Sequence, residues 1–315
     1  MTHRPVCVVG GGAVGLFLAA SFAPYTAVTL LVREAAAGAL AGSALRVSGA
    51  RTKAAPPDSV RVITDPAAIV PGAFLFLCTK AFDMVPALLR VRPSIGEHTP
   101  VVIWSNGLGL FAEAAAALPG NIPLLRGLSS FGVRRSTPVE VVLAGSVSVV
   151  LAGPARQEQY LDELVGLIKL IDGEVCVDGD VHRAEWEKAL LNLVVNPLCS
   201  LADDVNGRLL ADPRLRARAT ELLREIRLVA AAEGVDLSHR TDADVLRRVE
   251  LSAANTNSTL TDLRSGRRTE IEYLTGRFLG IAARHGIAVP ASSRLYEEMI
   301  RLEESRILVR SEGER

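Results

Sequence analysis

The sequence predicts an α/β protein in which an N-terminal, doubly wound parallel sheet precedes an all-helical C-terminal half. Two observations carry this prediction. Short apolar runs alternate with helical patterns in the first half, as in sheets whose parallel strands are joined by crossover helices. Beyond about residue 180 the strand-like runs stop, and apolar residues recur at three- and four-residue spacing. We therefore expect a sheet domain over residues 1–179 and a helical domain over residues 180–315.

Short apolar runs in the first half predict strands at Val6–Val9, Val28–Val32, Phe74–Cys78, Val101–Trp104 and Glu174–Val177. Ala13–Ala23 is small and apolar, as a helix packed on a sheet would be, and Ala155–Ile171 has helical periodicity. Residues 124–153 are β-rich, with Gly and Pro turns. Amphipathic patterns in the second half predict helices at Glu185–Leu201, Arg214–Glu233, Asp242–Leu251 and Glu270–His285. The apolar stripe of Arg214–Glu233 favours a core-facing surface, with a homodimer face as the open alternative.

The composition is that of a globular protein without a charge bias. Of the 315 residues, 49% are hydrophobic and 22% are charged, which supports a large core and argues against disorder. Lys+Arg and Asp+Glu both total 35, so the cationic excess of a nucleic-acid binder is missing. The chain contains no apolar run of about 18 residues, and its early glycines argue against a secretory signal. We expect a cytoplasmic protein without nucleic-acid or membrane partners.

Metal binding and cysteine chemistry are both disfavoured. The cysteines form no C-x-x-C pair, and the five histidines show no paired ligand spacing. Cys78 and Cys199 fit small buried hydrophobic residues better than nucleophiles. We therefore expect neither a metal site nor a disulfide framework.

A glycine-rich motif follows the first predicted strand. Gly10, Gly12 and Gly15 form G-x-G-x-x-G, and Ala13 and Val14 open the next helix. The first glycine allows the tight turn, the second lets a pyrophosphate approach the backbone, and the third lets helix and strand pack closely. The helix N-terminus offers N–H groups and a positive dipole end to the phosphates. These five residues therefore predict a Rossmann-type dinucleotide site.

Arg33, which lies 23 positions after Gly10, ends the second predicted strand. A guanidinium at this point can pair with a 2′-phosphate, whereas an NAD site usually has Asp or Glu there for the ribose hydroxyls. The predicted cofactor is therefore NADPH. Glu34 could supply the acid, so NADH stays open as the alternative.

Polar residues also follow two later strands, at the edge where parallel strands meet their ligands. Lys80 comes after Phe74–Cys78 and could face the cofactor or a substrate anion. Asn106 comes after Val101–Trp104 and could hold the nicotinamide ribose or a substrate oxygen. Only four of the 35 cationic residues are lysine. Because an ammonium can lose a proton and a guanidinium cannot, Lys80 and Lys188 stand out.

Lys188, Asn192 and Asn196 are spaced i, i+4, i+8 and form one polar stripe along an otherwise apolar helix. Buried polar groups need partners, which a functional site or a structural hydrogen-bond network would supply. A second polar cluster contains Ser258, which is expected to cap a short helix. The same cluster contains Glu270 at the start of an amphipathic helix, where an acid can also simply pair with the helix dipole.

Together these blocks resemble the ketopantoate reductase (2-dehydropantoate 2-reductase) family over nearly the whole chain. The blocks are GGGAVG at 10–15, Arg33, CTKAFD at 78–83, NGLG at 106–109, WEKALLNLVVNP at 186–197, NSTLTDL…GRRTEIEYLTG within 257–276 and HGIAVP at 285–290. The resemblance implies a Rossmann domain followed by a helical domain of the 6-phosphogluconate dehydrogenase type. It also implies NADPH-dependent reduction of a 2-oxo acid. The specific reaction that it implies is the conversion of 2-dehydropantoate to pantoate in pantothenate biosynthesis.

The same resemblance assigns roles to single residues. It implies that Lys188 and Glu270 are catalytic, that Asn192, Asn196, Ser258 and Lys80 bind substrate, and that Lys80 and Asn106 also serve the cofactor. In the expected mechanism the Lys188 ammonium stabilises charge on the carbonyl oxygen and donates the proton. Burial would lower the pKa of Lys188, and a nearby Glu270 carboxylate would raise it. Glu270 either orients Lys188 or binds a substrate hydroxyl, and Ser258 takes the substrate carboxylate.

The chain departs from the family pattern at Leu143, Thr259, Glu272 and Thr275. Three alternatives stay open. One is a related reductase that acts on another carbonyl or imine in a specialised biosynthetic pathway. Another is an opine-type dehydrogenase, which would require an added amine. The last is a non-enzymatic NADP-binding sensor, which the Lys188, Asn192, Asn196 and Glu270 set disfavours.

Overall fold

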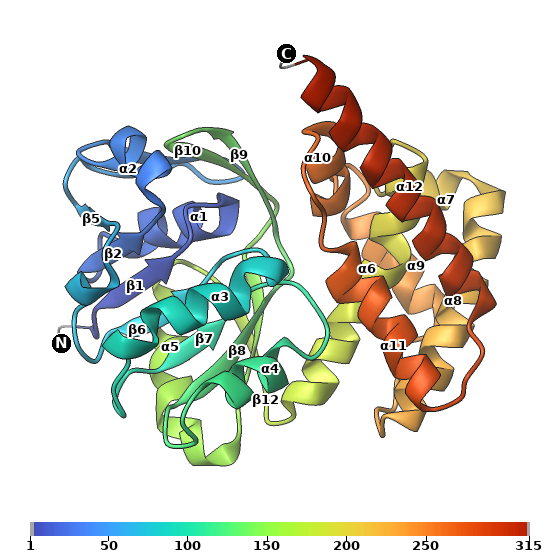
Figure 1. The fold of residues 1–315 in the computed structure, drawn as a ribbon, viewed down its shortest axis with the longest axis horizontal. Coiled ribbons are helices and arrows are strands. Elements are labelled where there is room, and N and C mark those ends of the chain that lie inside the picture. Colours follow the sequence, from blue (N-terminus) through green and yellow to red (C-terminus); the bar gives the residue numbers. More distant parts are fainter. Residues whose placement is uncertain (1–2, 314–315) are drawn as a thin grey trace. The chain divides into compact units, whose positions relative to one another are not determined.

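The computed structural model describes residues 3–313, so the first two and last two residues of the predicted domains lie outside it. The chain forms two compact units, drawn in Figure 1. The sheet unit contains the chain up to Ser105 and Gly109–Ala184. The helical unit contains Asn106–Leu108 and the chain from Glu185 onward.

The sheet unit is built on an eight-stranded sheet with the order β12-β11-β8-β7-β6-β1-β2-β5. Its strands are β1 (Val6–Val9), β2 (Val28–Leu31), β5 (Val60–Ile63), β6 (Phe74–Leu77), β7 (Val101–Ile103), β8 (Leu124–Ser129), β11 (Ser148–Ala152) and β12 (Glu174–Asp178). Neighbouring strands are parallel except β8 and β11, which are antiparallel. The predicted α/β fold class is thus confirmed.

A second, four-stranded sheet has the order β4-β3-β10-β9. It contains β3 (Leu45–Gly49), β4 (Lys53–Ala55), β9 (Gly132–Thr137) and β10 (Glu140–Ala144). Helix α1 (Ala13–Phe22) packs against strands of both sheets (Figure 1). Residues Gly15–Phe22 are therefore all buried, which explains why this helix is apolar on every face.

The remaining helices of the sheet unit are short. They are α2 (Glu34–Leu40), α3 (Ala81–Val91), α4 (Leu110–Ala117) and α5 (Glu158–Leu170). A short 3₁₀ turn, Ala155–Gln157, precedes α5 and takes up the start of the predicted helix. Helices α3 and α4 pack against each other, and α5 packs on β11 and β12.

The helical unit contains the predicted amphipathic helices and several others. Its elements are α6 (Val181–Leu201), α7 (Arg208–Ala211), α8 (Pro213–Ala232), α9 (Asp242–Leu251), α10 (Ser258–Arg264), α11 (Arg277–Arg284) and α12 (Pro290–Gly313). The first turn of α6, up to Ala184, belongs to the sheet unit. The stripe of α8 is core, since Leu222, Ile226 and Val229 are buried. None of the helices in the described part of the chain has both the length and the apolar character that a bilayer crossing needs.

The segment that starts at Glu270 is not the regular helix that was predicted. Residues Glu272–Gly276 form a π-helical turn that leads into α11. The four apolar residues expected on its inner face are nevertheless buried, namely Ile271, Leu274, Phe278 and Ile281. Single π turns often occur at functional sites.

Helix α12 braces this π turn. The Thr269 N–H donates to Glu303 Oε2 at 2.6 Å, and the Tyr296 hydroxyl donates to the Glu272 carboxylate. Burial, and then the Glu272 carboxylate, raises the pKa of Tyr296 to about 12. The phenol therefore stays protonated and keeps donating at neutral pH. Glu270 thus lies in a segment that α12 holds on both sides.

Candidate active site

The glycine-rich loop adopts the geometry that its sequence predicts. Gly10 has φ +113°, a conformation that favours glycine. A Cβ added to Gly15 would stand 1.9 Å from the Gly10 carbonyl oxygen, so only glycine fits there. At Gly12 an added Cβ would meet nothing nearer than the Cys78 oxygen at 4.0 Å. The loop is tight on its protein side and open at Gly12.

Helix α1 begins directly after this loop, at Ala13, and Gly12 supplies no side-chain cap. The first-turn N–H groups, including those of Ala13 and Val14, are therefore available to an anion. The loop and the helix start together fit the pyrophosphate of a dinucleotide.

Arg33 follows β2 and precedes α2, with 76% of its side chain exposed. Its Nη2 lies 2.6 Å from Asp83 Oδ2, in the first turn of α3. Sequence reasoning singled out Arg33 but not Asp83. The signal that could have found it was an acid three residues after Lys80, beyond a strand that neighbours the glycine loop.

Lys80 is half-buried at the start of α3. Next to it, the Ser105 hydroxyl donates to the Thr79 carbonyl at 2.6 Å, which ties the end of β6 to the end of β7. Arg126 is fully buried on β8 and donates to the carbonyls of Ile103 and Ser105, both at 2.7 Å. These bonds fix the edge of the sheet where the predicted ligand residues lie.

Lys188, Asn192 and Asn196 are half-buried on α6, as are Glu187 and Leu191. Ala189, Leu190, Leu193, Val194 and Val195 are each at most 5% exposed. Lys188, Asn192 and Asn196 therefore lie on a half-buried side of α6, next to a face that is packed into the core. Helix α6 runs through Pro197 to Leu201.

Glu187, which precedes Lys188, anchors α6 to the segment before α9. It accepts hydrogen bonds from His239 Nε2 at 2.9 Å and from Arg240. Burial raises the pKa of Glu187, but Arg240 and His239 outweigh it and hold the pKa below its ordinary value. The carboxylate is thus committed to a structural role.

Glu270 is 6% exposed and lies next to Asn106 in the helical unit. Asn106 Nδ2 donates to Glu270 Oε2 at 3.4 Å. Two further bonds hold the Asn106–Leu108 segment. The Leu108 N–H donates to the Tyr273 carbonyl at 3.0 Å, and Arg277 Nη1 donates to the Leu108 carbonyl at 2.5 Å. The structure therefore brings Asn106 to Glu270.

Ser258 is exposed at the first position of α10, and the prediction that it caps this helix is wrong. The cap is Asn257, whose side chain accepts from the Leu260 N–H at 2.9 Å. Asn257 is buried and also contacts Ser200 and Asn206. Since both residues are good caps, this burial decides between them, and the Ser258 hydroxyl stays accessible.

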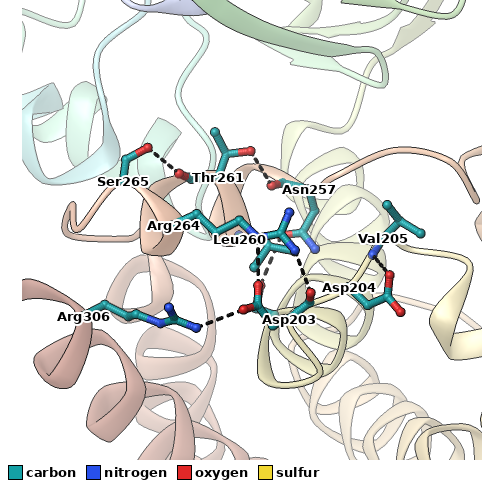
Figure 2. A network of polar contacts seen from close by, with 10 residues as sticks. Asp203, Asp204, Val205, Asn257, Leu260, Thr261, Arg264, Ser265 and Arg306 are labelled. Atoms are coloured by element: carbon teal, nitrogen blue, oxygen red, sulfur yellow. Dashed lines mark hydrogen bonds and ion pairs between the residues drawn. The ribbon is translucent and has the colours of Figure 1, made fainter. Parts of the chain in front are cut away.

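The polar network in Figure 2 involves both ends of α10, from its cap Asn257 to its last residue, Arg264. Asp203 accepts from Arg264 Nε at 2.7 Å and from Arg306 Nη2 at 3.0 Å. The hydrogen bond from Arg264, together with both guanidinium charges, holds the pKa of Asp203 below its ordinary value. The network ties α10 and α12 to the end of α6.

The cysteines near the motifs are poor nucleophiles. Burial raises the pKa of Cys199 to about 11 and also raises that of Cys78. Both thiols therefore stay protonated at neutral pH. Within residues 3–313, no group of three or more His, Cys, Asp or Glu side chains is placed to hold a metal ion.

Comparison with protein families gives two matches. The model described as ketopantoate reductase PanE/ApbA matches residues 6–156, and the model of the C-terminal part of that family matches residues 180–303. Among curated proteins, the 2-dehydropantoate 2-reductase of Yersinia pestis is 32% identical over 242 residues. That match covers 76% of this chain and 77% of the relative.

Solved structures share the fold. A PanE/ApbA family ketopantoate reductase from Ralstonia eutropha JMP134 has a TM-score of 0.85 at 24% identity, covering 96% of this chain and 99% of that one. A D-mandelate dehydrogenase with NADH and anilino(oxo)acetate has a TM-score of 0.86 at 20% identity, with the same coverage. The two family matches and the Yersinia relative show that this chain belongs to the ketopantoate reductase family of oxidoreductases.

Proposed function

We propose that this protein uses NADPH to reduce the C2 carbonyl of a 2-oxo acid to a hydroxyl, with 2-dehydropantoate as substrate. The observation that carries the proposal is the half-buried polar stripe of Lys188, Asn192 and Asn196 beside the buried apolar face of α6. A polar stripe of this kind suits a small polar substrate. Curated relatives named 2-dehydropantoate 2-reductase support the choice of substrate.

Cofactor binding is assigned to the domain of residues 1–179. Gly10, Gly12, Ala13, Val14 and Gly15 would hold the pyrophosphate, because the loop is open at Gly12 and α1 starts without a side-chain cap. Arg33 would pair with the 2′-phosphate, and Lys80 would bind the cofactor or a substrate anion. When bound, the reduced nicotinamide supplies the hydride that the reaction needs.

Substrate binding is assigned to the domain of residues 180–315. The Lys188 ammonium stabilises the charge that develops on the carbonyl oxygen and donates a proton to it. Asn192 and Asn196 hold the carbonyl and hydroxyl oxygens, whose loss would leave these amides unpaired. The accessible Ser258 hydroxyl binds the substrate carboxylate.

Glu270 is assigned to the same reaction as a buried carboxylate that Asn106 orients. A carboxylate next to an ammonium raises the lysine pKa, and one next to the substrate accepts a hydroxyl proton. Either role requires the carboxylate to be held in place, and the Asn106 amide supplies a hydrogen bond that does this.

A second candidate is the reduction of a different carbonyl. Two of the positions where the chain departs from the family pattern lie in the π turn, and both have distinctive surroundings. Glu272 accepts from the Tyr296 hydroxyl, and the buried Thr275 Oγ1 has no hydrogen-bond partner within the described residues. Because these positions lie two and five residues after Glu270 along the chain, a changed substrate is the specific alternative they favour.

NADPH oxidation followed at 340 nm with 2-dehydropantoate tests the proposal. NADH and a panel of other 2-oxo acids, each with and without an added amine, run in parallel. Rapid turnover of 2-dehydropantoate with NADPH is expected. Faster turnover of another 2-oxo acid would move the assignment to that substrate. Turnover only with an added amine would indicate an imine substrate, and no turnover with any acid would contradict the proposed function.

A further inference from the structure

Arg33 and Asp83 lie on either side of the glycine-rich loop. In the large sheet β1 pairs with β2 on one side and with β6 on the other. Arg33 lies just beyond the end of β2, and Asp83 lies in the first turn of α3, which follows β6. Their ion pair, with Nη2 and Oδ2 2.6 Å apart, joins the segments that follow these two strands. The glycine-rich loop follows the strand between them.

The ion pair sets the charge that a cofactor phosphate would meet. Asp83 is the carboxylate that the Arg33 guanidinium contacts within the described residues. A 2′-phosphate that binds Arg33 would therefore approach a carboxylate on the same guanidinium, and like charges at such a distance repel. NADH carries a neutral hydroxyl instead of this phosphate, so the carboxylate opposes it far less.

We propose that Asp83 is a specificity-determining residue, which competes with the 2′-phosphate of NADPH for Arg33 and so narrows the preference for NADPH over NADH. The inference rests on the proposed function, because it takes Arg33 to be the phosphate-binding residue. The pair is accessible enough to rearrange, with 76% of the Arg33 side chain and 36% of the Asp83 side chain exposed.

The test is direct binding, measured by the change in nicotinamide fluorescence on titration of NADPH and of NADH. The Asp83→Asn variant keeps the shape of the side chain and removes its charge. Its dissociation constant for NADPH should fall by about 3- to 10-fold, the range of one partly exposed charge interaction with a doubly charged phosphate. Its dissociation constant for NADH should stay within about 2-fold of the wild-type value.

Two further variants separate this effect from general ones. Asp162→Asn makes the same charge change at an exposed residue of α5, which packs on β11 and β12, and it should leave both constants unchanged. In an Arg33→Gln background no guanidinium is left for Asp83 to compete for. Asp83→Asn should then change the dissociation constant for NADPH much less, so the effects of the two substitutions should be strongly non-additive. Melting temperatures of all variants show whether the loss of the acid from the first turn of α3 affects folding.

The outcomes distinguish this inference from the proposed function. If the wild-type chain binds NADPH but Asp83→Asn binds it equally or more weakly, the proposal that Asp83 competes for Arg33 is wrong, and the proposed function stands. An equal gain for NADH and NADPH would also overturn the competition. If the wild-type chain binds neither cofactor, the proposed function and the role of Asp83 both fall.

Discussion

The amide of Asn106 and the carboxylate of Glu270 lie 3.4 Å apart, although 164 positions separate them along the chain. Asn106 follows a strand of the large sheet, yet it groups with the helical unit. The Leu108 N–H donates to the Tyr273 carbonyl, and the Leu108 carbonyl accepts from Arg277. The Arg277 guanidinium also stacks 4.4 Å from the centre of the Tyr273 ring.

Arg277 is therefore expected to keep Asn106 against Glu270. The Arg277→Met variant retains much of the stem and loses the donor to Leu108. Its kcat should fall about 10-fold, with a smaller change in the KM for NADPH, because misplaced catalytic groups lower the rate even when they are not removed.

The control for Arg277 is Arg284→Met, which changes an exposed arginine on the same helix. This variant should keep the wild-type kcat. Equal losses in the two variants would show that Arg277 supports only the folding of α11.

Lys188→Ala should lower kcat by about 10²- to 10⁴-fold, the usual contribution of a positioned general acid. Lys188→Arg should not restore activity, because a guanidinium does not release its proton near neutral pH. Steady-state rates at 340 nm measure both, and Lys169→Ala, at an exposed position of α5, serves as control. A Lys188→Ala rate within a few-fold of wild type would refute its catalytic role.

Glu225 holds the start of α12 from within the core. Its carboxylate is 1% exposed and accepts from the N–H groups of Ala291 and Ser292, both at 2.8 Å, and from the Ser292 hydroxyl at 2.7 Å. Glu225→Ala leaves these donors without this acceptor and should cost about 2–4 kcal/mol of unfolding free energy. Urea denaturation measures this, with the exposed Glu221→Ala as control. Equal urea midpoints for Glu225→Ala and Glu221→Ala would contradict this role of Glu225.

Glu187 should make stability depend on acid pH. Its pKa in the folded chain is below the ordinary value of 4.5, so its stabilising effect is complete above that value and is lost as pH falls through the folded pKa. Glu187→Gln should therefore be less stable than wild type at neutral pH, and the difference should shrink below about pH 4.5. Urea midpoints between pH 3 and 7 test this, with Glu250→Gln on α9 as control. A difference independent of pH would contradict it.

Much of the fold could be predicted because its signals are local. The turn at Gly10–Gly15 is encoded by adjacent residues, and the stripe of Lys188, Asn192 and Asn196 follows from helical periodicity. The second sheet was harder, because β3 and β4 mix buried and exposed residues and form no apolar run, and because β3 pairs with β10, which lies far along the chain. Helix α12 was not predicted either, since its many charged residues obscure the few that are fully buried.

The contacts of the site were less predictable than its residues. The Asn106–Glu270 hydrogen bond and the Arg33–Asp83 ion pair join residues on separate elements, and no spacing in the sequence marks them. The choice of Asn257 over Ser258 as the cap of α10 depends on burial against Ser200 and Asn206. The π turn changes the helical geometry without changing which apolar residues face the core.

The fate of the hydride tests the proposed function most directly. The protein is incubated with 2-dehydropantoate and with NADPH that carries deuterium at the transferred position of C4, and the product is examined by NMR and mass spectrometry. Pantoate with one deuterium at C2 is the predicted product, formed by the wild-type chain and about 10²- to 10⁴-fold more slowly by Lys188→Ala. Oxidation of NADPH without deuterium at C2, or no pantoate from the wild-type chain, would contradict the account.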